Sequence, residues 1–337
     1  MNMDRQEHSC IFSFREEIKA MNKFFGKIFL ASIPFLVYIA LFVKYEPYNY
    51  WGIKPEKSGN WATPLARVRE FMRHPSENII LGDSRMNHFD LDSVEEQTGV
   101  KYANLSTGGQ AYNLSLQLYE WAKSKTNIQS LIVDASFYQI RKGNMSPSAE
   151  PVFLIAEEPL TYFVTRDYVI EAFDLCYNDI KKYFGKDVDD IKTDTEMSDG
   201  KYRGDLIHYA TQNIYPGCQN YSIGEEQMEY ITQIVDDVKE QGGKVIIVIP
   251  PIQESIWDYV IRPLELEADM AKYKEILIQH ATLYDGEWIS EFSMNQDIYA
   301  DGFHFLLEDG YQQFQNAIFI GNENILKVRK CPTDDEG

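Results

Sequence analysis

The chain has 337 residues, of which 44% are hydrophobic and 14% aromatic, enough to bury the core of one large α/β domain but short of two comfortable ones. Its formal net charge of −20 argues against nucleic acid as a partner, because phosphate binding requires a basic surface. The four cysteines form no C-x-x-C pair, so no zinc or redox motif of that kind is visible.

The N-terminal region contains one apolar segment long enough to cross a lipid bilayer. Phe24 to Val43 is apolar apart from Lys27, and about 20 such residues span a membrane. Basic residues gather before this segment, at Arg5, Arg15, Lys19, Lys23 and Lys27, whereas Lys44 alone follows closely. The positive-inside rule therefore predicts a cytoplasmic tail at 1–23, a single-pass transmembrane helix at 24–43 and an extracytoplasmic remainder at the cell membrane. A buried helix and a cleaved signal peptide are the alternatives, and the missing small-x-small site argues against the second.

After this anchor, residues 44–75 are rich in aromatic residues, proline and glycine, which indicates an interfacial collar and linker ending in a short helix, Thr63–Arg73. Strands and helices then alternate, which predicts an α/β fold with a central parallel sheet of about five strands. The predicted strands are Ile79–Leu81, Tyr102–Leu105, Leu131–Phe137, Val245–Ile249 and Leu283–Tyr284. The clearest predicted helices are Tyr112–Lys123, Glu225–Gln241, Glu265–His280 and Tyr311–Ile325.

One stretch, 141–224, interrupts this alternation. It holds a predicted helix, Asp167–Tyr183, and an acidic loop, Lys186–Asp205. An insertion of this length beside the carboxyl edge of a sheet is typical of a lid or a partner surface. Cys176 and Cys218 also lie in it and could pair or remain thiols. We therefore divide the remaining chain into a domain at 76–328, which contains this insertion, and a polar tail at 329–337.

The first predicted strand runs directly into Gly82-Asp83-Ser84, within "NIILGDSRMNHFD". A serine at such a junction would lie at the sheet edge where open α/β proteins bind ligands, with neighbouring amide N–H groups facing a developing oxyanion. A serine hydroxyl is a weak nucleophile unless a base accepts its proton and a further group orients that base. Alone, the tripeptide is equally compatible with an ordinary turn.

The far end of the chain provides a base and an orienting acid. In "YADGFHFLLEDGY", Asp301 precedes His304 by three residues, so a turn can fold the carboxylate onto the imidazole and leave the other ring nitrogen for a serine. The alternative is a turn before a helix with an exposed histidine. His88, one helical turn from Ser84, is a weaker candidate base because no acid is spaced to orient it.

Gly108 and Gly109 follow the second predicted strand, in "YANLSTGGQAYN". A glycine there lets the backbone approach a ligand closely and can aim an N–H at an oxyanion, although a plain strand-to-helix turn has the same sequence requirements. We therefore include both glycines as candidate oxyanion donors.

Taken together, "GDS", a glycine and "DGFH", in this order on an alternating α/β chain, resemble the SGNH (GDSL-like) hydrolase superfamily over about residues 76–320. The resemblance implies a three-layer, flavodoxin-like fold. It also implies Ser84 as the nucleophile, His304 as the base, Asp301 as the acid, and Gly109 or Gly108 as the oxyanion glycine.

The sequence departs from this family after the third strand. The G-x-N-D block, whose Asn side chain donates to the oxyanion, is missing from "LIVDASFYQIRKGN". Ser136 or Asn144 could replace that donor, or it is absent; Arg85 could contact substrate or form a structural salt bridge. Losing one donor typically costs about 10²–10³ in turnover, so the departure bears on rate and substrate more than on reaction class. The same loss resembles the superfamily's membrane-anchored branch, which includes the D-alanine transfer protein of teichoic acid synthesis (DltD) and exopolysaccharide O-acetylation proteins.

The resemblance thus implies a membrane-anchored acyl-transfer enzyme, an O-acyltransferase or an acetyl esterase, that acts on cell-envelope polysaccharide through an acyl-enzyme on Ser84. Its implied protein partner is a membrane-bound O-acyltransferase, and the resemblance implies no metal or organic cofactor. The residues do not distinguish water from a sugar hydroxyl as the acceptor. The alternative is a catalytically silent SGNH-shaped adaptor for such an O-acyltransferase, favoured by the missing Asn and disfavoured by the retained Ser84, Asp301 and His304.

Overall fold

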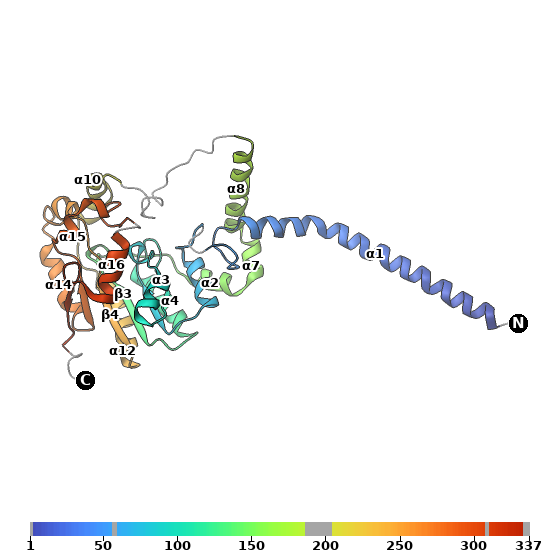
Figure 1. Cartoon of the computed structure of the whole chain (residues 1–337), viewed down its shortest axis with the longest axis horizontal. Helices are drawn as coiled ribbons and strands as arrows, with labels where there is room; N and C mark the ends of the chain where they lie inside the picture. The colour runs from blue at the N-terminus through green and yellow to red at the C-terminus, as the bar shows by residue number, and fades with distance from the viewer. Residues whose placement is uncertain (1–2, 56–58, 186–203, 307–309, 333–337) are drawn as a thin grey trace. The chain divides into compact units, whose positions relative to one another are not determined.

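The computed structural model describes residues 3–55, 59–185, 204–306 and 310–332, with side chains from residue 21 onward. Two compact units make up the chain, Met1–Pro47 with Leu160–Val188 and Tyr48–Pro159 with Asp189–Gly337. The first is formed by helix α1 (Met3–Tyr45) and the helices α7 (Pro159–Val164) and α8 (Arg166–Tyr183), and the second contains the sheet (Figure 1).

In the first unit, α1 carries an apolar segment, Met21–Tyr45, that is long and apolar enough to cross a membrane. This segment includes the predicted span at 24–43, and α1 also continues back through most of the predicted tail. The end of α1 is packed against α7 and α8: Tyr38 stacks on Phe173, and Tyr162 donates a hydrogen bond to Glu46. Helix α8 matches the helix predicted inside the insertion.

The second unit is built on a six-stranded sheet with the order β2-β1-β3-β4-β5-β6. Five strands are parallel, and β6 pairs antiparallel with β5 at one edge. The order changes direction between β1 and β3, the position at which open α/β sheets form a crevice at their carboxyl ends. The strands are β1 (Asn78–Leu81), β2 (Ala103–Asn104), β3 (Ser130–Asp134), β4 (Lys244–Ile249), β5 (Thr282–Asp285) and β6 (Lys327–Arg329).

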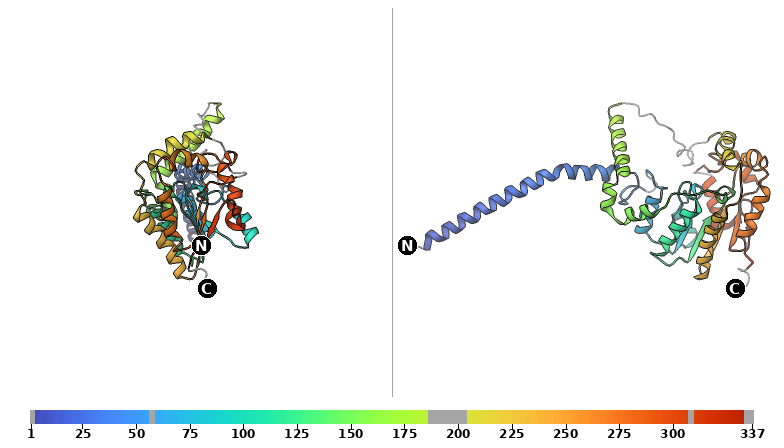
Figure 2. Two further views of the ribbon diagram at one scale, coloured as in Figure 1. Left: turned by 90° about the vertical axis from the view of Figure 1, so that its left-hand side faces the viewer. Right: turned by 180° about the vertical axis from the view of Figure 1, so that it is seen from behind.

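Helices lie on both faces of this sheet (Figure 2). Side chains alternate along each strand, so Ile80, Ile132 and Val248 enter a core with Phe89 and Phe314 on one face. Helix α12 packs against α4, β3 and β4. The α-helices of this unit are α2 (Pro64–Arg73), α3 (Leu91–Thr98), α4 (Tyr112–Lys123), α5 (Phe137–Ile140), α6 (Glu150–Glu157), α10 (Leu206–His208), α11 (Tyr215–Cys218), α12 (Glu225–Glu240), α13 (Glu254–Ile256), α14 (Glu267–Leu277), α15 (Glu291–Met294) and α16 (Gln312–Asn316). Short 3₁₀ helices are η1 (Ser84–Met86) and η4 (Gln296–Ile298), and π-helical segments are η2 (Tyr209–Ile214), η3 (Trp257–Ile261) and η6 (Ala317–Gly321).

All five predicted strands are present, but two elements differ from the prediction. Strand β3 ends at Asp134 rather than Phe137, because Ser136 caps α5 by accepting a hydrogen bond from Gln139 N–H. The last predicted helix is shorter, since α16 passes into η6, which ends at Gly321 with a φ of +96°. Strand β6 was not predicted from the sequence.

The predicted collar and tail also differ from the structure. Tyr50 is fully buried and donates to the carbonyls of Ile155 and Ala156, and the unit that contains the sheet begins at Tyr48, so most of 44–75 belongs to that folded unit. The tail boundary at 329 falls inside β6, and Cys331 beyond it is fully buried. The acidic loop Lys186–Asp205 lies almost entirely outside the described residues. The described cysteines, at 176, 218 and 331, are free thiols.

Candidate active site

The turn after β1 holds Ser84 at the start of η1. Asp83 caps this short helix by accepting a hydrogen bond from Arg85 N–H at 2.9 Å, and its own N–H donates to Asp134 Oδ2 at 3.0 Å. A Cβ at Gly82 would lie 2.6 Å from Met86 Cγ and 2.8 Å from Asp134 Cγ, closer than side chains pack. Glycine is therefore required for the turn to approach β3 this closely.

Three residues from the two ends of the unit form a continuous chain of hydrogen bonds. Ser84 Oγ lies 2.6 Å from His304 Nε2, and His304 Nδ1 lies 2.7 Å from Asp301 Oδ2. The other carboxylate oxygen of Asp301 accepts the N–H groups of Phe303 and His304, each at 2.7 Å. These bonds fix the imidazole ring with one nitrogen toward the acid and the other toward the serine.

Burial and nearby charges shift the pKa of the candidate base, His304, in opposite directions. Burial of the His304 ring lowers its pKa, but the nearby carboxylates of Asp301 and then Asp83 raise it by more, so the pKa lies above its ordinary value. Asp301 and His304 are nearly enclosed, whereas Ser84 is half-buried. An imidazolium formed when His304 accepts a proton is therefore stabilised at this position.

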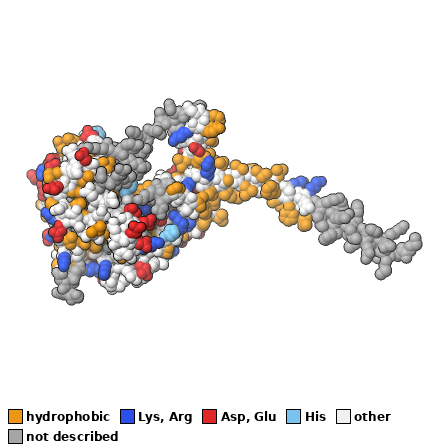
Figure 3. Space-filling model, in the orientation of Figure 1, with side chains coloured by type: hydrophobic (Ala, Val, Ile, Leu, Met, Phe, Trp, Pro, Cys, Tyr) orange, Lys and Arg blue, Asp and Glu red, His pale blue; other side chains and the backbone are white. Residues whose placement is uncertain are grey.

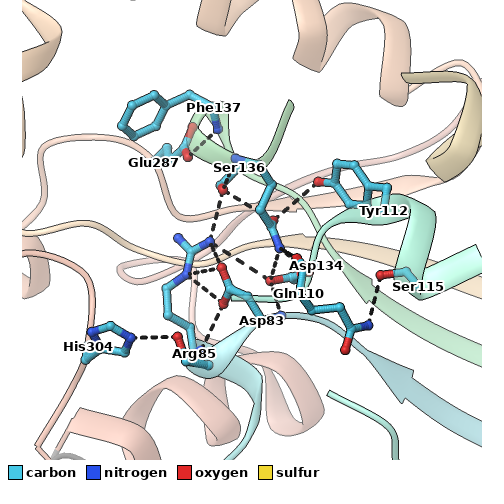
Figure 4. A network of polar contacts seen from close by, with 12 residues as sticks. Asp83, Arg85, Gln110, Tyr112, Ser115, Asp134, Ser136, Phe137, Glu287 and His304 are labelled. Atoms are coloured by element: carbon cyan, nitrogen blue, oxygen red, sulfur yellow. Dashed lines mark hydrogen bonds and ion pairs between the residues drawn. The ribbon is translucent and has the colours of Figure 1, made fainter. Parts of the chain in front are cut away.

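Arg85, the residue after the serine, is turned into a buried network rather than toward solvent (Figure 4). Its Nη2 donates to Asp83 Oδ2 at 2.6 Å and to Ser136 Oγ at 3.0 Å, and it lies 4.0 Å from Asp134 Oδ2. The guanidinium carbon lies 5.2 Å from the centre of the Phe303 ring. Its remaining nitrogen, Nη1, is buried and has no hydrogen-bond partner among the described residues.

The pKa values of the two carboxyl groups in this network are shifted in opposite directions. Burial raises the pKa of Asp83, but the charge and hydrogen bonds of Arg85 outweigh it, so that pKa lies below its ordinary value. Burial and the charge of Asp83 raise the pKa of Asp134 well above its ordinary value, which favours the protonated acid. Arg85 therefore favours the ionised form of Asp83 more than that of Asp134.

The two candidate glycines lie in the loop after β2, next to the serine turn. Thr107 N–H donates to the Gly82 carbonyl at 3.1 Å, which ties the loop to that turn. Gly108 N–H donates to the Ala62 carbonyl at 3.2 Å, so this N–H already has an acceptor within the structure. Gly109 is exposed and has a φ of +63°, a conformation that favours glycine. Of the pair, Gly109 remains the candidate donor.

The two side chains considered as substitutes for the missing Asn have structural hydrogen bonds. Ser136 is fully buried; its hydroxyl donates to Gln139 Oε1 at 3.3 Å and accepts from Arg85 and from Gln139 N–H. Asn144 Nδ2 donates to the Gln139 carbonyl at 3.0 Å. The one hydroxyl hydrogen of Ser136 is therefore used, and the amide of Asn144 is held by the Gln139 carbonyl.

Sequence reasoning missed several residues that surround the serine. Tyr311 OH donates to the Ser84 carbonyl at 3.2 Å, and the ring of Tyr209 lies 6.4 Å from that of His304. Asp134 could have been found, because it ends the strand adjacent to β1, and parallel strands meet at the same edge. Tyr209 could not, since it lies in the insertion. His88 packs its ring against Trp61 and Tyr311, while His304 is bonded to Ser84.

No family model matches the sequence, and no curated protein matches it. The chemistry of the site therefore has to be read from its geometry. No group of three or more His, Cys, Asp or Glu side chains within the described ranges is arranged to hold a metal ion. What the arrangement can do is remove a proton from the Ser84 hydroxyl and return it to a leaving group.

Proposed function

We propose that this protein is a membrane-anchored acyl-transfer enzyme of the SGNH type that forms an acyl-enzyme on Ser84. The observation that carries the proposal is the unbroken chain from Ser84 through His304 to Asp301, with bonds of 2.6 and 2.7 Å. Side chains 217 residues or more apart in sequence rarely meet in this order without a shared task. The arrangement has the roles of nucleophile, base and orienting acid that serine hydrolases use.

In the proposed reaction, Ser84 Oγ attacks an ester carbonyl while its proton passes to His304 Nε2. Asp301 accepts a hydrogen bond from Nδ1, which keeps the ring in the required tautomer and stabilises the imidazolium. The tetrahedral intermediate then collapses: the ester C–O bond breaks, and the leaving alcohol takes the proton from His304. A second alcohol or water repeats these steps in reverse and frees Ser84.

The developing oxyanion needs hydrogen-bond donors. We assign this role to the N–H groups of Ser84 and Gly109. Ser84 lies in the turn after β1 and Gly109 in the loop after β2, and the Thr107–Gly82 hydrogen bond ties these two segments together. Arg85 is proposed as an electrostatic contributor, because its buried Nη1 has no hydrogen-bond partner among the described residues. Its positive charge lies beside Phe303, the neighbour of the base in sequence.

The wider features support an extracytoplasmic role on an envelope polymer. The strand order 2-1-3-4-5 is that of flavodoxin-like sheets, which the SGNH superfamily also uses, and Ser84 follows β1 at the point where that order reverses. An apolar helix with basic residues before it supports a single-pass anchor with the N-terminus in the cytoplasm. We propose cell-envelope polysaccharide as the substrate, with a membrane-bound O-acyltransferase as partner, and either an O-acyltransferase or an acetyl esterase reaction.

One observation favours the alternative of a catalytically silent adaptor for such an O-acyltransferase. Ser136 and Asn144, the two side chains considered in place of the missing Asn donor, both make structural hydrogen bonds. Loss of one donor typically costs about 10²–10³ in turnover, which slows an enzyme without abolishing its acylation.

A fluorophosphonate probe distinguishes the two functions, because it reacts covalently with activated serines. We expect the full-length protein to be labelled and the Ser84→Ala variant to be unlabelled. Ser148→Ala is the matched control, since Ser148 is an exposed serine outside the site and that variant is expected to be labelled like the wild type. Hydrolysis of a small acetate ester should be lost in parallel with labelling.

If folded wild-type protein is not labelled by the probe, the proposal of an acyl-transfer enzyme is wrong and the adaptor function is favoured. Labelling that persists in Ser84→Ala would assign the reactivity to another residue. Circular dichroism and thermal unfolding of each variant verify that it is folded.

A further inference from the structure

Helix α8 carries a stripe of apolar side chains on its outer surface. Five of them recur at intervals of three and four residues and so share one face of the helix: Ile170, Phe173, Tyr177, Ile180 and Phe184. Each is exposed, from 39% for Phe173 to 72% for Phe184. The buried residues of α8, Ala172 and Cys176, lie beside this stripe on another face. Phe173 also stacks on Tyr38 of α1, so the stripe borders the surface by which α8 packs in its unit, and its other members are exposed.

Helix α7, which precedes α8, extends this apolar surface. Leu160 is 81% exposed and Val164 is 77% exposed. Figure 3 shows hydrophobic side chains continuing from α1 over this part of the unit. Exposed apolar surface of this extent marks an interaction site rather than ordinary solvent-facing surface.

The position of α7 and α8 on α1 indicates what covers the stripe. The ring of Phe42 contacts Tyr162 and Phe163, at 5.1 and 5.2 Å between centroids, and Tyr45 OH donates to Asp179 at 2.7 Å. Phe42 and Tyr45 are among the last residues of the apolar segment Met21–Tyr45. Its 25 residues reach about 37 Å at 1.5 Å each, roughly 7 Å more than a hydrocarbon core. This end of α1 therefore reaches the headgroup layer, and α7 and α8 lie with it.

We propose that α7 and α8 form an interfacial anchor, with the apolar stripe of α8 and with Leu160 and Val164 of α7 embedded at the boundary between lipid headgroups and acyl chains. The proposal rests on the proposed membrane span of α1 and is independent of the chemistry at Ser84. The chain is then attached to the membrane at two places, by the span of α1 and by this interfacial anchor.

The composition of α8 fits this layer. Tyrosine and phenylalanine rings are favoured at membrane interfaces, and Tyr177 and Tyr183 are 57% and 86% exposed. Lys181 lies over the Tyr177 ring at 4.3 Å, so its ammonium can reach lipid phosphates while its stem covers apolar surface. Charged residues Asp174 and Lys182 lie away from the stripe, as in helices that rest in the plane of a membrane. The three-and-four spacing also suits a coiled coil with a second copy, but the stripe belongs to the same unit as the apolar segment of α1, which favours lipid.

Tryptophan quenching by brominated lipids tests the proposal on the full-length protein. Ile180→Trp places a probe on the stripe, and Lys182→Trp places a matched control on the opposite, charged face of the same helix turn. Both are reconstituted into phosphatidylcholine–phosphatidylglycerol vesicles whose acyl chains are brominated near the headgroup, and the wild-type signal from the five native tryptophans is subtracted. We expect about twofold more quenching for Ile180→Trp than for Lys182→Trp, and less when the bromines lie at the chain ends.

Flotation with the vesicles is measured alongside, because it reports whether the chain is attached to the membrane at all. Equal quenching of the two variants in chains that float would overturn the interfacial anchor while leaving the span intact. Quenching that depends on protein density instead of bromine position would place a second copy on the stripe and would likewise overturn the proposal. Chains that fail to float would refute the span on which it rests.

Discussion

At the scale of single residues, Asp301 determines how the candidate base is presented. One of its carboxylate oxygens accepts two backbone N–H groups of its own loop, and the other faces His304 Nδ1. These bonds fix the carboxylate before any substrate arrives, so the ring of His304 has one orientation. The D-x-x-H spacing therefore builds the acid and its support from four consecutive residues.

Replacing Asp301 by Asn tests this role. The amide keeps the size of the side chain but favours the wrong imidazole tautomer, so we expect turnover of an acetate ester to fall by about 10³–10⁴ with little change in KM. Steady-state kinetics provides the measurement, and the thermal unfolding midpoint provides the control for folding. A variant that retains more than a tenth of wild-type turnover would contradict the assignment of Asp301.

The pH dependence of the reaction follows from the raised pKa of His304. The base must be neutral to accept the serine proton, so kcat/KM should rise with pH through a midpoint above about 6.5, the usual value for a histidine. In Asp301→Asn the largest raising influence is gone, and burial should then shift the midpoint below that of the wild type. An unchanged midpoint in the variant would show that a group other than His304 controls the rise of kcat/KM with pH.

Arg85 has a measurable role in stability. Arg85→Leu leaves the buried Asp83 carboxylate without its guanidinium, and we expect a loss of about 3–5 kcal/mol of unfolding free energy at neutral pH. Because Arg85 lowers the pKa of Asp83, the stabilisation is present above the unfolded pKa near 3.8 and is lost as the pH falls through the folded pKa. The difference between wild type and variant in urea unfolding should therefore shrink below about pH 4. Lys123 forms an ion pair at the surface with Asp237, and its side chain is 39% exposed. The control variant Lys123→Leu should therefore lose less than about 1 kcal/mol of unfolding free energy.

At the scale of elements, the junction from β1 to η1 depends on the absence of a side chain at Gly82. In Gly82→Ala the new methyl group would collide with Met86 and Asp134, so we expect a loss of about 1–3 kcal/mol and displacement of Ser84. Gly108→Ala is the matched control for stability, since a Cβ there has no heavy atom within 4 Å. Urea unfolding measures the stability change and probe labelling measures the state of Ser84. Equal stability of the two variants would show that the turn tolerates a side chain.

The sequence predicted the elements whose signals are local. The five parallel strands are short apolar runs, and Ser84, Asp301 and His304 lie in turns marked by glycine. Strand β6 was missed because "KVR" has little apolar character, and it is stabilised by pairing with β5, a contact distant in sequence. The same applies to the site: Ser136 looked like a donor beside the strand, but its hydroxyl is occupied by Gln139 and Arg85, contacts set by tertiary packing.

For the whole molecule, the two units carry different physical tasks. The first contains the long apolar helix and the exposed apolar surface of α7 and α8, whereas the second buries its core and presents Ser84 at a sheet edge. The insertion predicted at 141–224 contributes to both, since α8 belongs to the first unit and Tyr209 packs near His304 in the second. Parts of one predicted insertion therefore lie in both units.

The orientation of the chain across the membrane is the remaining expectation, and its native cysteines allow a direct test. The basic residues before the span predict that Cys10 faces the cytoplasm, while the three other cysteines are buried. A membrane-impermeant maleimide should therefore leave the wild-type protein unlabelled in intact cells and label it after permeabilisation, and Cys10→Ser should remove that signal. Glu96→Cys, at an exposed position on α3, should be labelled in intact cells because its unit is expected outside. Labelling of Cys10 in intact cells would reverse the topology and exclude an extracellular polymer as the substrate.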